Sequence, residues 1–355
     1  MKRKKLLIID KHQFGDLTDS FKWCEYLKNK YDITIVTLCS GEKKDITMEG
    51  VNIVCAKSSN RILRGLMFTL LAILYLILSK KVVLVVFYKG CTIYKKLFPW
   101  KKMILDIRTL AVNKDAKIRN TYDVKIKDAC EVYDYVTIIS KGLAKKLDLL
   151  SSHYSILPLG ADSLSDLPKT YNDMRLLYVG TLSGRNIDES IKGVALFANK
   201  YPSISFSYDI VGDGTEGELE MLKQMVQECG LESVVTLHGR KSYDELKPFF
   251  DRCNVGISYI PCTDYYDYQP PTKTFEYVLS GLYCIATATL SNKELITHDN
   301  GILINSTSES FAEALNTVSS ILPQLDEKII RESLSTYTWR NIIEQYLEPI
   351  INKYI

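Results

Sequence analysis

Short apolar runs that alternate with segments of helix length fill the first 140 residues of this chain. LLIID at 6–10 precedes a polar turn and the helical stretch LTDSFKWCEYLKN. A run without polar positions is typical of a strand buried on both faces, as in a parallel sheet. Further runs follow at 33–38, 51–56, 82–88, 101–106 and 135–140. Strands that alternate with helices predict a doubly wound parallel α/β sheet.

The same alternation starts again after residues 160–173, GADSLSDLPKTYND, which are rich in turn formers and lack a hydrophobic period. A chain of 355 residues has room for two domains with a core each. We expect one Rossmann-like domain at 1–165, a second at 166–335, and a helix at 336–355 that packs back on the first. Two such sheets facing each other would place a site in the cleft between their strand ends.

The cysteines and histidines do not suggest a metal site. Nine cysteines are an odd number, they are scattered, and none forms a CxxC pair. This pattern predicts reduced thiols in a cytosolic protein, without a disulfide framework. His12, His153 and His238 are too far apart in the sequence to suggest a ligand set. The N-terminal MKRKKLLIID has a basic flank, but its apolar run is too short for a signal peptide.

Five motifs of the second half stand in a recognisable order and spacing. They are YVGTLSGRNIDESIKG, DIVGDG, LHGRKSYDELKPFFDRCNVGISYIP, PPTKTFEYVLSGLYCIAT and NKELITHDNGILI. Together they resemble the C-terminal domain of GT-B glycosyltransferases of the family 4 type (glycosyl transferases group 1), especially bacterial enzymes of capsular and other surface polysaccharide synthesis. The resemblance covers residues 170–340. Over the first half it rests on the strand order, the loop at Gly15 and ILPLGAD at 156–162.

The resemblance implies a retaining glycosyltransferase that uses a UDP-sugar or GDP-sugar as donor and a lipid-linked saccharide as acceptor. The donor would lie on the C-terminal domain, and neither a metal nor a cofactor is expected. In the implied front-face mechanism the leaving phosphate itself helps to take the acceptor proton, so that no strong protein base is needed.

Cations and helix amino ends are needed where the leaving diphosphate develops charge. Arg185, in the loop GTLSGRN, falls about where the family has a phosphate-binding lysine, and an arginine fork suits two phosphate oxygens. Thr181 stands where a further family arginine is often found, which leaves one phosphate cation unaccounted for. Gly15, in HQFGDL, matches the family's glycine-containing loop that approaches the donor phosphates.

Lys273 is the candidate for the vacant cationic position. Pro270 and Pro271 fix the start of a helix, because proline needs no amide partner in a first turn. The amides near Thr272, Lys273 and Thr274 would then be free to bind an anion. A cation at a helix start is disfavoured by the dipole unless an anion is present. This stretch therefore predicts a diphosphate site.

Other donor contacts follow from the family signature of two glutamates separated by seven residues. Glu276 matches the second, which would accept hydrogen bonds from the ribose diol, although an acid in a first helical turn also stabilises the helix dipole. Tyr268 stands in place of the first glutamate, which contacts the donor sugar, with Asp267 beside it. Arg240 and Gly239 lie in the loop where the nucleobase is expected.

The first half lacks the histidine that many family members carry after a middle strand. The nearest match is LDIRTL, with Asp106 and Arg108 as candidate catalytic residues. Arginine cannot act as a base at neutral pH, so either Asp106 assists or Arg108 binds substrate charge. Asp106 is equally interpretable as a structural carboxylate at a strand end.

The two halves of the chain carry opposite charge. Residues 1–165 hold 29 Lys and Arg against 16 Asp and Glu, whereas residues 166–355 hold 16 against 26. Residues 51–100 contain eight basic residues and no acidic one, around the apolar run at 62–78. Apolar surface ringed by cations is typical of contact with an anionic bilayer, and we favour this over a span or simple core burial. No basic-aromatic motif indicates nucleic acid.

These features predict a cytoplasmic enzyme, peripheral on the inner face of the cell membrane. Its predicted partners are a nucleotide sugar, a lipid-linked saccharide acceptor and an anionic membrane surface. A catalytically idle subunit or scaffold of the same fold stays open as an alternative because of the departures at Thr181, Arg108 and Tyr268. A sugar nucleotide epimerase is a weaker alternative, since nothing in the sequence supplies its acid and base.

Overall fold

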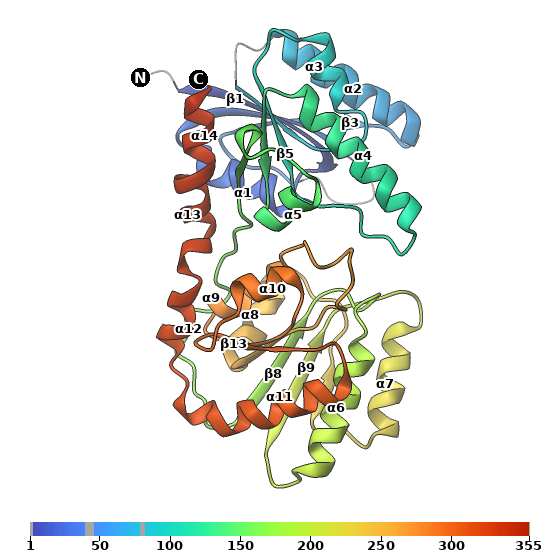
Figure 1. The fold of residues 1–355 in the computed structure, drawn as a ribbon, viewed down its shortest axis with the longest axis vertical. Helices are drawn as coiled ribbons and strands as arrows, with labels where there is room; N and C mark the ends of the chain where they lie inside the picture. Colours follow the sequence, from blue (N-terminus) through green and yellow to red (C-terminus); the bar gives the residue numbers. More distant parts are fainter. Residues whose placement is uncertain (1–2, 40–45, 79–81, 355) are drawn as a thin grey trace. The chain divides into compact units, whose positions relative to one another are not determined.

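The chain divides into two compact units (Figure 1). Unit 1 comprises Met1–Gly160 and Trp339–Ile355, and unit 2 comprises Ala161–Thr338. The computed structural model describes residues 3–39, 46–78 and 82–354. The boundaries expected from the sequence were 165 and 335.

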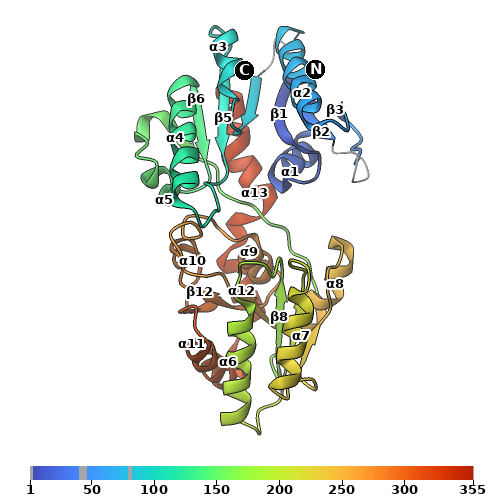
Figure 2. The ribbon, with the colours of Figure 1, turned by 90° about the vertical axis from the view of Figure 1, so that its right-hand side faces the viewer.

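One parallel sheet forms the centre of unit 1 (Figure 2). Its described strands have the order β3-β2-β1-β4-β5-β6-β7. They are β1 (Lys4–Gln13), β2 (Tyr31–Cys39), β3 (Val51–Lys57), β4 (Val82–Val86), β5 (Met103–Ile107), β6 (Tyr135–Ile138) and β7 (Tyr154–Ile156). All six predicted runs form strands, and β7 is an addition at the sheet edge. The chain order reverses between β1 and β4, which opens a crevice at their carboxyl ends.

Helices surround this sheet, and some of them come from the C-terminal segment of the chain. The helices are α1 (Thr18–Leu27), α2 (Arg61–Leu78), α3 (Thr92–Leu97), α4 (Ala116–Val132), α5 (Lys141–Lys146) and the 3₁₀ turn Ser151–His153. From the C-terminal segment come α13 (Trp339–Ile342), the π-helical turn Ile343–Leu347 and α14 (Glu348–Lys353). Trp339 is fully buried and packs so closely on Gly160 that a Cβ there would lie 2.6 Å from its ring.

Helix α2 contacts β2 and β3 but leaves most of its apolar residues exposed. It buries Phe68, Ala72 and Leu76, whereas Ile62 is 77% and Leu70 66% exposed. Among the described residues it is the one helix long and apolar enough to cross a membrane, with a mean hydropathy of 2.0 and 17% of its residues buried. Simple burial in the core does not describe this helix. The flanking cations Lys80 and Lys81 lie outside the described residues.

Unit 2 repeats the architecture with the strand order β10-β9-β8-β11-β12-β13. Its strands are β8 (Met174–Val179), β9 (Phe206–Val211), β10 (Val235–Leu237), β11 (Val255–Ser258), β12 (Tyr283–Thr287) and β13 (Gly301–Ile304). Its helices are α6 (Ile187–Lys200), α7 (Glu218–Glu228), α8 (Tyr243–Arg252), α9 (Thr272–Leu279), α10 (Leu290–Leu295), α11 (Ser308–Ile321) and α12 (Glu327–Ser333), with 3₁₀ turns Leu322–Gln324 and Ser335–Tyr337. The predicted second α/β sheet is confirmed, and its chain order reverses between β8 and β11.

One expectation about the cysteines is wrong. Cys39 at the end of β2 and Cys55 on the adjacent β3 form a disulfide, with their Cα atoms 5.8 Å apart. The other seven cysteines, all within the described ranges, are free thiols. Residues 16 positions apart in the sequence meet here because parallel pairing aligns the two strands, which the spacing alone does not reveal.

We expect Trp339→Ala to destabilise unit 1 by about 3–5 kcal/mol, the usual cost of deleting a buried aromatic side chain. Urea unfolding followed by tryptophan fluorescence measures this change, because Trp23, Trp100 and Trp339 all lie in unit 1. Tyr346→Ala, at a half-exposed position of the same segment, is the control. Equal effects of the two substitutions would contradict the role of Trp339 as the anchor.

Candidate functional site

A cavity of about 380 Å³ lies at the carboxyl edge of the unit 2 sheet. Its walls come from the segments after β8 and β11 and from the first turns of α9, so it lies where the strand order reverses. The lining includes Gly180, Arg185, Tyr266, Gln269, Lys273 and Glu276. Four of the predicted donor-binding residues, Arg185, Thr272, Lys273 and Glu276, therefore meet at one cavity.

The prolines set the start of α9 as expected. Pro271 is the N-cap residue in an extended conformation, and no side chain caps the helix. The amides of Thr272 and Lys273 donate no hydrogen bond within the described part of the chain. The Thr274 amide, by contrast, donates to the Pro271 carbonyl oxygen at 3.0 Å. Two amides, rather than the predicted three, are left for a ligand.

Tyr277 fixes α9 against β8. Its hydroxyl oxygen accepts a hydrogen bond from the Val179 amide at 2.7 Å, which ties the first turns of the helix to the end of β8, just before Gly180. Gly256 on β11 makes room for this ring, since a Cβ there would lie 2.3 Å from it. The position of Lys273 is thus determined by packing two turns away from the prolines.

The Lys273 ammonium group is buried without a hydrogen-bond partner among the described residues. Its Nζ lies 3.9 Å from the centre of the Tyr178 ring and fits beside Gly180, where a Cβ would approach it to 3.0 Å. Desolvation lowers the pKa of Lys273, and the charge of Arg185 lowers it further. A buried cation without an acceptor is costly unless an anion enters the cavity.

Arg185 supplies the second cation of this cavity. Its guanidinium lies 4.4 Å from the centre of the Tyr266 ring, an arrangement that attracts a cation to the ring face. It forms no ion pair with any residue in the described ranges. Two cations around one space, against the single carboxylate of Glu276, are suited to binding a diphosphate.

Glu276 is the acidic residue that lines the same cavity. Burial raises the pKa of its carboxyl group, against the opposing effect of Lys273. Its carboxylate makes no hydrogen bond with the described residues, so both oxygens are available to a ligand. This arrangement suits the predicted binding of a ribose diol better than stabilisation of a helix dipole.

A second cavity of about 260 Å³ adjoins the first, since Val179 and Gly180 line both. Arg240 and Lys241 lie on its wall, whereas Gly239 does not. The Gly239 carbonyl oxygen instead accepts a hydrogen bond from the Gly212 amide at 3.0 Å, which fixes the loop behind Arg240. This space lies next to the cationic cavity, where a nucleoside attached to the diphosphate would extend.

Besides Gly239, three predicted donor residues of unit 2 do not line these cavities. The buried Thr274 hydroxyl is hydrogen bonded with Ser258 and Asn292, at 2.7 and 3.0 Å, so Thr274 is structural. Asp267 accepts the Ser291 amide through its backbone oxygen, at 2.9 Å, and faces the start of α10. Tyr268 is also absent from the lining, and the predicted contact of Asp267 and Tyr268 with the donor sugar stays a prediction.

The same loop brings in two residues that sequence reasoning missed. Tyr266 and Gln269 line the cavity on either side of the predicted pair. The turn Thr263–Gln269 decides which side chains face inward, because the Tyr266 and Asp267 amides both donate to the Thr263 carbonyl. The sequence signal was a tyrosine-rich segment before the prolines, which does not specify orientation.

The candidate catalytic residues of unit 1 make several contacts within the fold. Asp106 is fully buried and accepts a hydrogen bond from the Thr137 hydroxyl at 2.6 Å. The Arg108 guanidinium is paired with Asp19 at 2.5 Å, lies 3.6 Å from Asp106, and donates to the Leu157 carbonyl at 2.8 Å. These contacts favour the structural interpretation of Asp106. They also mean that Arg108 is not available as a free charge for a substrate.

Gly15 stands in a turn of unit 1 with a positive φ of 95°. A Cβ there would lie 2.5 Å from the Ile46 side chain, so the turn requires glycine for its own geometry. Its predicted approach to donor phosphates stays a prediction.

His12, at the end of β1, is paired with Asp10. Its Nδ1 lies 2.7 Å from the Asp10 carboxylate, which raises the pKa of the imidazole, while half of the side chain is exposed. No cluster of three or more metal-binding side chains occurs in the part of the chain that the structure describes. This histidine lies at the end of the first strand rather than after a middle strand, and sequence reasoning assigned it no role.

Comparison with known protein families agrees with the geometry of unit 2. Residues 173–320 match the family model of glycosyl transferases group 1. The matched segment, which is most of unit 2, is a domain of the glycosyl transferases group 1 type. The matched segment contains both cavities of unit 2 and every one of their lining residues. No curated protein sequence matches the chain significantly.

Solved structures show that the glycosyltransferase has the GT-B fold over its whole length. Sucrose-phosphate synthase from Thermosynechococcus elongatus matches with a TM-score of 0.77 and 15% identity, covering 99% of both chains. HepE of Anabaena, solved with UDP and glucose, matches at 0.73 and 13%, covering 99% of this chain and 100% of its own. The lipopolysaccharide outer core galactosyltransferase WaaB matches at 0.72 and 15%, covering 98% and 99%.

We expect Asp106→Asn to stabilise the glycosyltransferase at neutral pH. Burial raises the pKa of Asp106 from 3.8 to about 6, so the folded state binds more protons than the unfolded state between these values. Wild-type stability therefore falls as the pH rises through this interval. The variant does not lose this stability, because asparagine carries no titrating carboxyl group. The difference in the free energy of unfolding between variant and wild type should rise in favour of the variant by on the order of 1–3 kcal/mol from pH 4.5 to pH 7.5.

Urea unfolding at both pH values, followed by tryptophan fluorescence, measures this difference. Asp128→Asn, at an exposed position of α4, provides the control and should show no such pH dependence. A difference between Asp106→Asn and wild type that stays constant with pH would refute the argument.

Proposed function

We propose that the glycosyltransferase transfers a sugar from a UDP-sugar to a lipid-linked saccharide with retention of the anomeric configuration. The bond from the sugar C1 to the diphosphate oxygen breaks, and a bond from C1 to an acceptor hydroxyl oxygen forms on the same face. The acceptor proton passes to the leaving phosphate. Retention and surface polysaccharide synthesis rest on the family resemblance.

The Lys273 ammonium carries the donor part of the proposal. It is buried, lacks an acceptor among the described residues, and shares a cavity with Arg185. A diphosphate supplies the missing counter-charge, and two free amides at the start of α9 add donors. Glu276 is placed one turn further to accept hydrogen bonds from a ribose. No protein base is needed if the leaving phosphate takes the proton, which agrees with the structural roles of Asp106 and Arg108.

Uridine is favoured over guanosine by the comparison with HepE, whose solved complexes contain UDP, UDP-glucose, and UDP with glucose. The adjoining cavity, with a volume of about 260 Å³, is the proposed place of the base. Arg240 and Lys241 on its wall would contact the base or the nearer phosphate.

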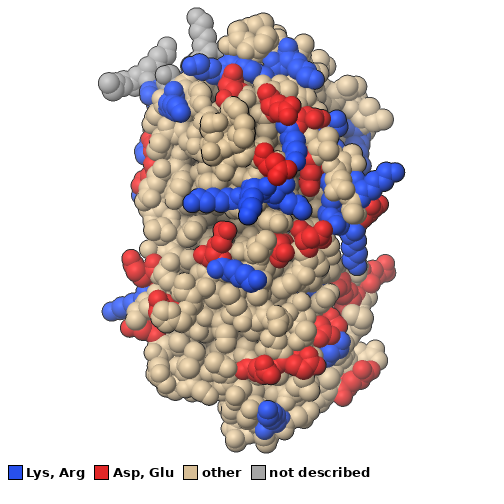
Figure 3. All heavy atoms as spheres, viewed as in Figure 1, with Lys and Arg blue, Asp and Glu red and all other residues tan. Residues whose placement is uncertain are grey.

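The exposed face of α2 supports a peripheral position on an anionic membrane, and hence a lipid-linked acceptor. Ile62, Leu66 and Leu70 recur every fourth residue and are each more than half exposed. On the face shown in Figure 3, Lys and Arg atoms are spread over unit 1. Apolar side chains would enter the bilayer while surrounding cations meet anionic headgroups.

Lys273→Met should weaken UDP binding at least tenfold and at the same time stabilise the fold. The substitution removes the cation that a diphosphate neutralises, and we expect at least a tenfold loss of UDP affinity, about 1.4 kcal/mol. It also removes an uncompensated buried charge, so the midpoint of urea unfolding without ligand should rise. Calorimetric titration with UDP and urea unfolding measure the two effects.

Lys223→Met, at an exposed lysine of α7, is the matched control and should leave both properties unchanged. Failure of the wild-type protein to bind UDP would refute the donor assignment. Transfer assays with a panel of UDP-sugars and lipid-linked acceptors then separate an enzyme from the scaffold alternative, which predicts binding without turnover. The anomeric configuration of the product tests retention.

Replacement of Leu66 and Leu70 by Gln should reduce binding to vesicles of phosphatidylcholine and phosphatidylglycerol at least tenfold in co-sedimentation. Burying a leucine side chain contributes about 1.5–3 kcal/mol, and both residues belong to the exposed face. The matched control replaces Leu196 and Leu290 of unit 2, which are also exposed. Equal recovery of the wild-type protein in the supernatant with and without vesicles would end the membrane proposal.

A further inference from the structure

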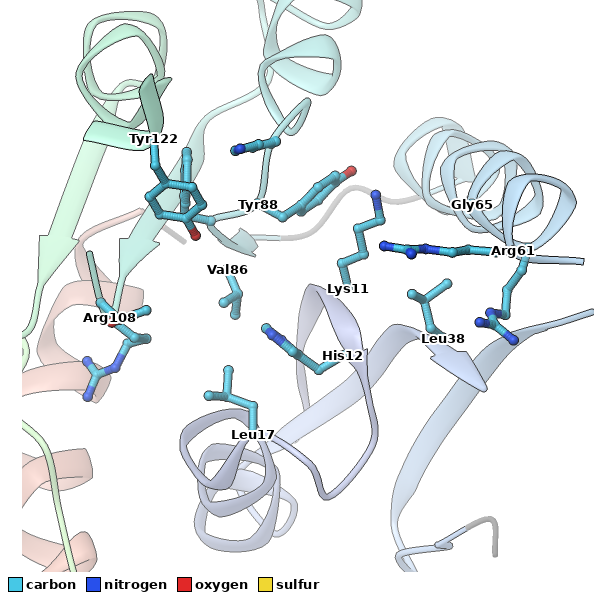
Figure 4. Close-up of a pocket in the computed structure, with 14 residues that line it drawn as sticks. Lys11, His12, Leu17, Leu38, Arg61, Gly65, Val86, Tyr88, Arg108 and Tyr122 are labelled. Atoms are coloured by element: carbon cyan, nitrogen blue, oxygen red, sulfur yellow. The ribbon is translucent and has the colours of Figure 1, made fainter. Parts of the chain in front are cut away.

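A basic cavity of about 480 Å³ lies in unit 1 at the carboxyl ends of β1, β2, β4 and β5. Lys11 and His12 come from the end of β1, and Tyr88 and Lys89 follow β4 (Figure 4). Strands β1 and β4 are those between which the chain order reverses, so this is the binding crevice of the unit 1 sheet. None of the predicted site residues other than Arg108 lines it.

The lining of this cavity is cationic. Lys11, Arg61, Arg64, Lys89 and Arg108 all contribute to it, and neither Asp nor Glu occurs among its described lining residues. Arg108 is neutralised by Asp19, and its guanidinium points away from the other cations in Figure 4. The other four basic residues surround a space without a carboxylate, where their charges repel one another.

Two of these cations rest on aromatic rings instead of acids. The Lys11 Nζ lies 4.8 Å from the centre of the Tyr88 ring, and the Lys89 Nζ lies 5.3 Å from that of Tyr122. Lys11, Lys89 and Arg61 form no ion pair within the described part of the chain. A ring face orients an ammonium group without neutralising it, so these charges are left for a ligand.

The first turns of α2 form one wall, and a glycine keeps that wall open. Gly65 lines the cavity, and a Cβ there would meet no atom within 4 Å. Glycine inside a helix costs about 1 kcal/mol relative to alanine. On the same helix, Ile62 and Leu66 are 77% and 58% exposed. The cationic space and the apolar face of α2 are therefore contiguous along one helix.

We propose that this cavity binds the phosphate or diphosphate group of a lipid-linked acceptor, with Lys11, Lys89 and Arg61 as its ligands. The inference rests on the proposed function and gives the acceptor a chemical class, namely an anionic headgroup attached to an apolar chain. Arg61 and the two ammonium groups provide the charge. The lipid chain would follow the exposed face of α2 towards the bilayer.

The test uses the full-length chain saturated with UDP, so that the unit 2 cavity cannot take up the probes. Farnesyl diphosphate, inorganic pyrophosphate and farnesol are titrated by calorimetry. We expect farnesyl diphosphate to bind at least tenfold more tightly than either of the other two. Replacing Lys11 and Lys89 by Gln should weaken its binding at least tenfold and leave UDP affinity unchanged.

The matched control replaces Lys125 and Lys127, two exposed lysines of α4, and should retain wild-type affinity for farnesyl diphosphate. Gly65→Phe provides a second variant, because its ring would fill the open space without removing a charge. This substitution should also weaken farnesyl diphosphate binding and spare UDP binding.

Several outcomes would overturn the inference. They are no binding of farnesyl diphosphate to the UDP-saturated protein, equal binding by the Lys11 and Lys89 variant, or equal affinity for pyrophosphate, which would indicate a site for a free anion. Failure of the proposed function has a different signature, since wild-type protein would then not bind UDP in the preceding titration.

Discussion

Parallel strands require cover on both faces, and this requirement confines the polar chemistry of the protein to the strand ends. The inner strand β1 of unit 1 is an example, because Leu6, Leu7, Ile8 and Ile9 are fully buried. Side chains that bind charged ligands cannot lie within such a sheet, so they gather in the segments that follow the strands. Both units have a crevice where the chain order reverses, and in both the crevice is lined by cations.

In the unit 2 cavity, a feature that suits anion binding lowers the stability of the fold. Lys273 is held between Tyr178 and Gly180, and the Tyr277 hydroxyl anchors its helix to β8. This anchoring prevents the ammonium group from reaching water, although it has no hydrogen-bond acceptor in the described ranges. The desolvation of this cation lowers the stability of the protein without a ligand. An anion that enters the cavity binds more tightly, because the cation has already been desolvated during folding.

The sequence predicted the fold and the two cations that line the unit 2 cavity, since both depend on local patterns. Alternating apolar runs identify strands, and two prolines identify the start of α9. Which side chains face inward was not predictable between positions 263 and 269, because a turn without periodicity sets their orientation. The partners of Asp106 and Arg108 were also beyond the sequence. Asp19 and Leu157 approach Arg108, and Thr137 approaches Asp106, only after the sheet and its connections have formed.

The net charge of each half of the chain predicts the charge around its cavity only in part. Unit 2 is acidic overall, yet its cavity is lined by two cations and a single carboxylate. Many of its acids lie on exposed helix faces, where Asp188 and Glu189 pair with Lys192 on α6 and Glu220 pairs with Lys223 on α7. In unit 1 the excess of Lys and Arg does reach the crevice. A donor diphosphate and an anionic acceptor would thus each bind next to cations, although the net charges of the two halves have opposite signs.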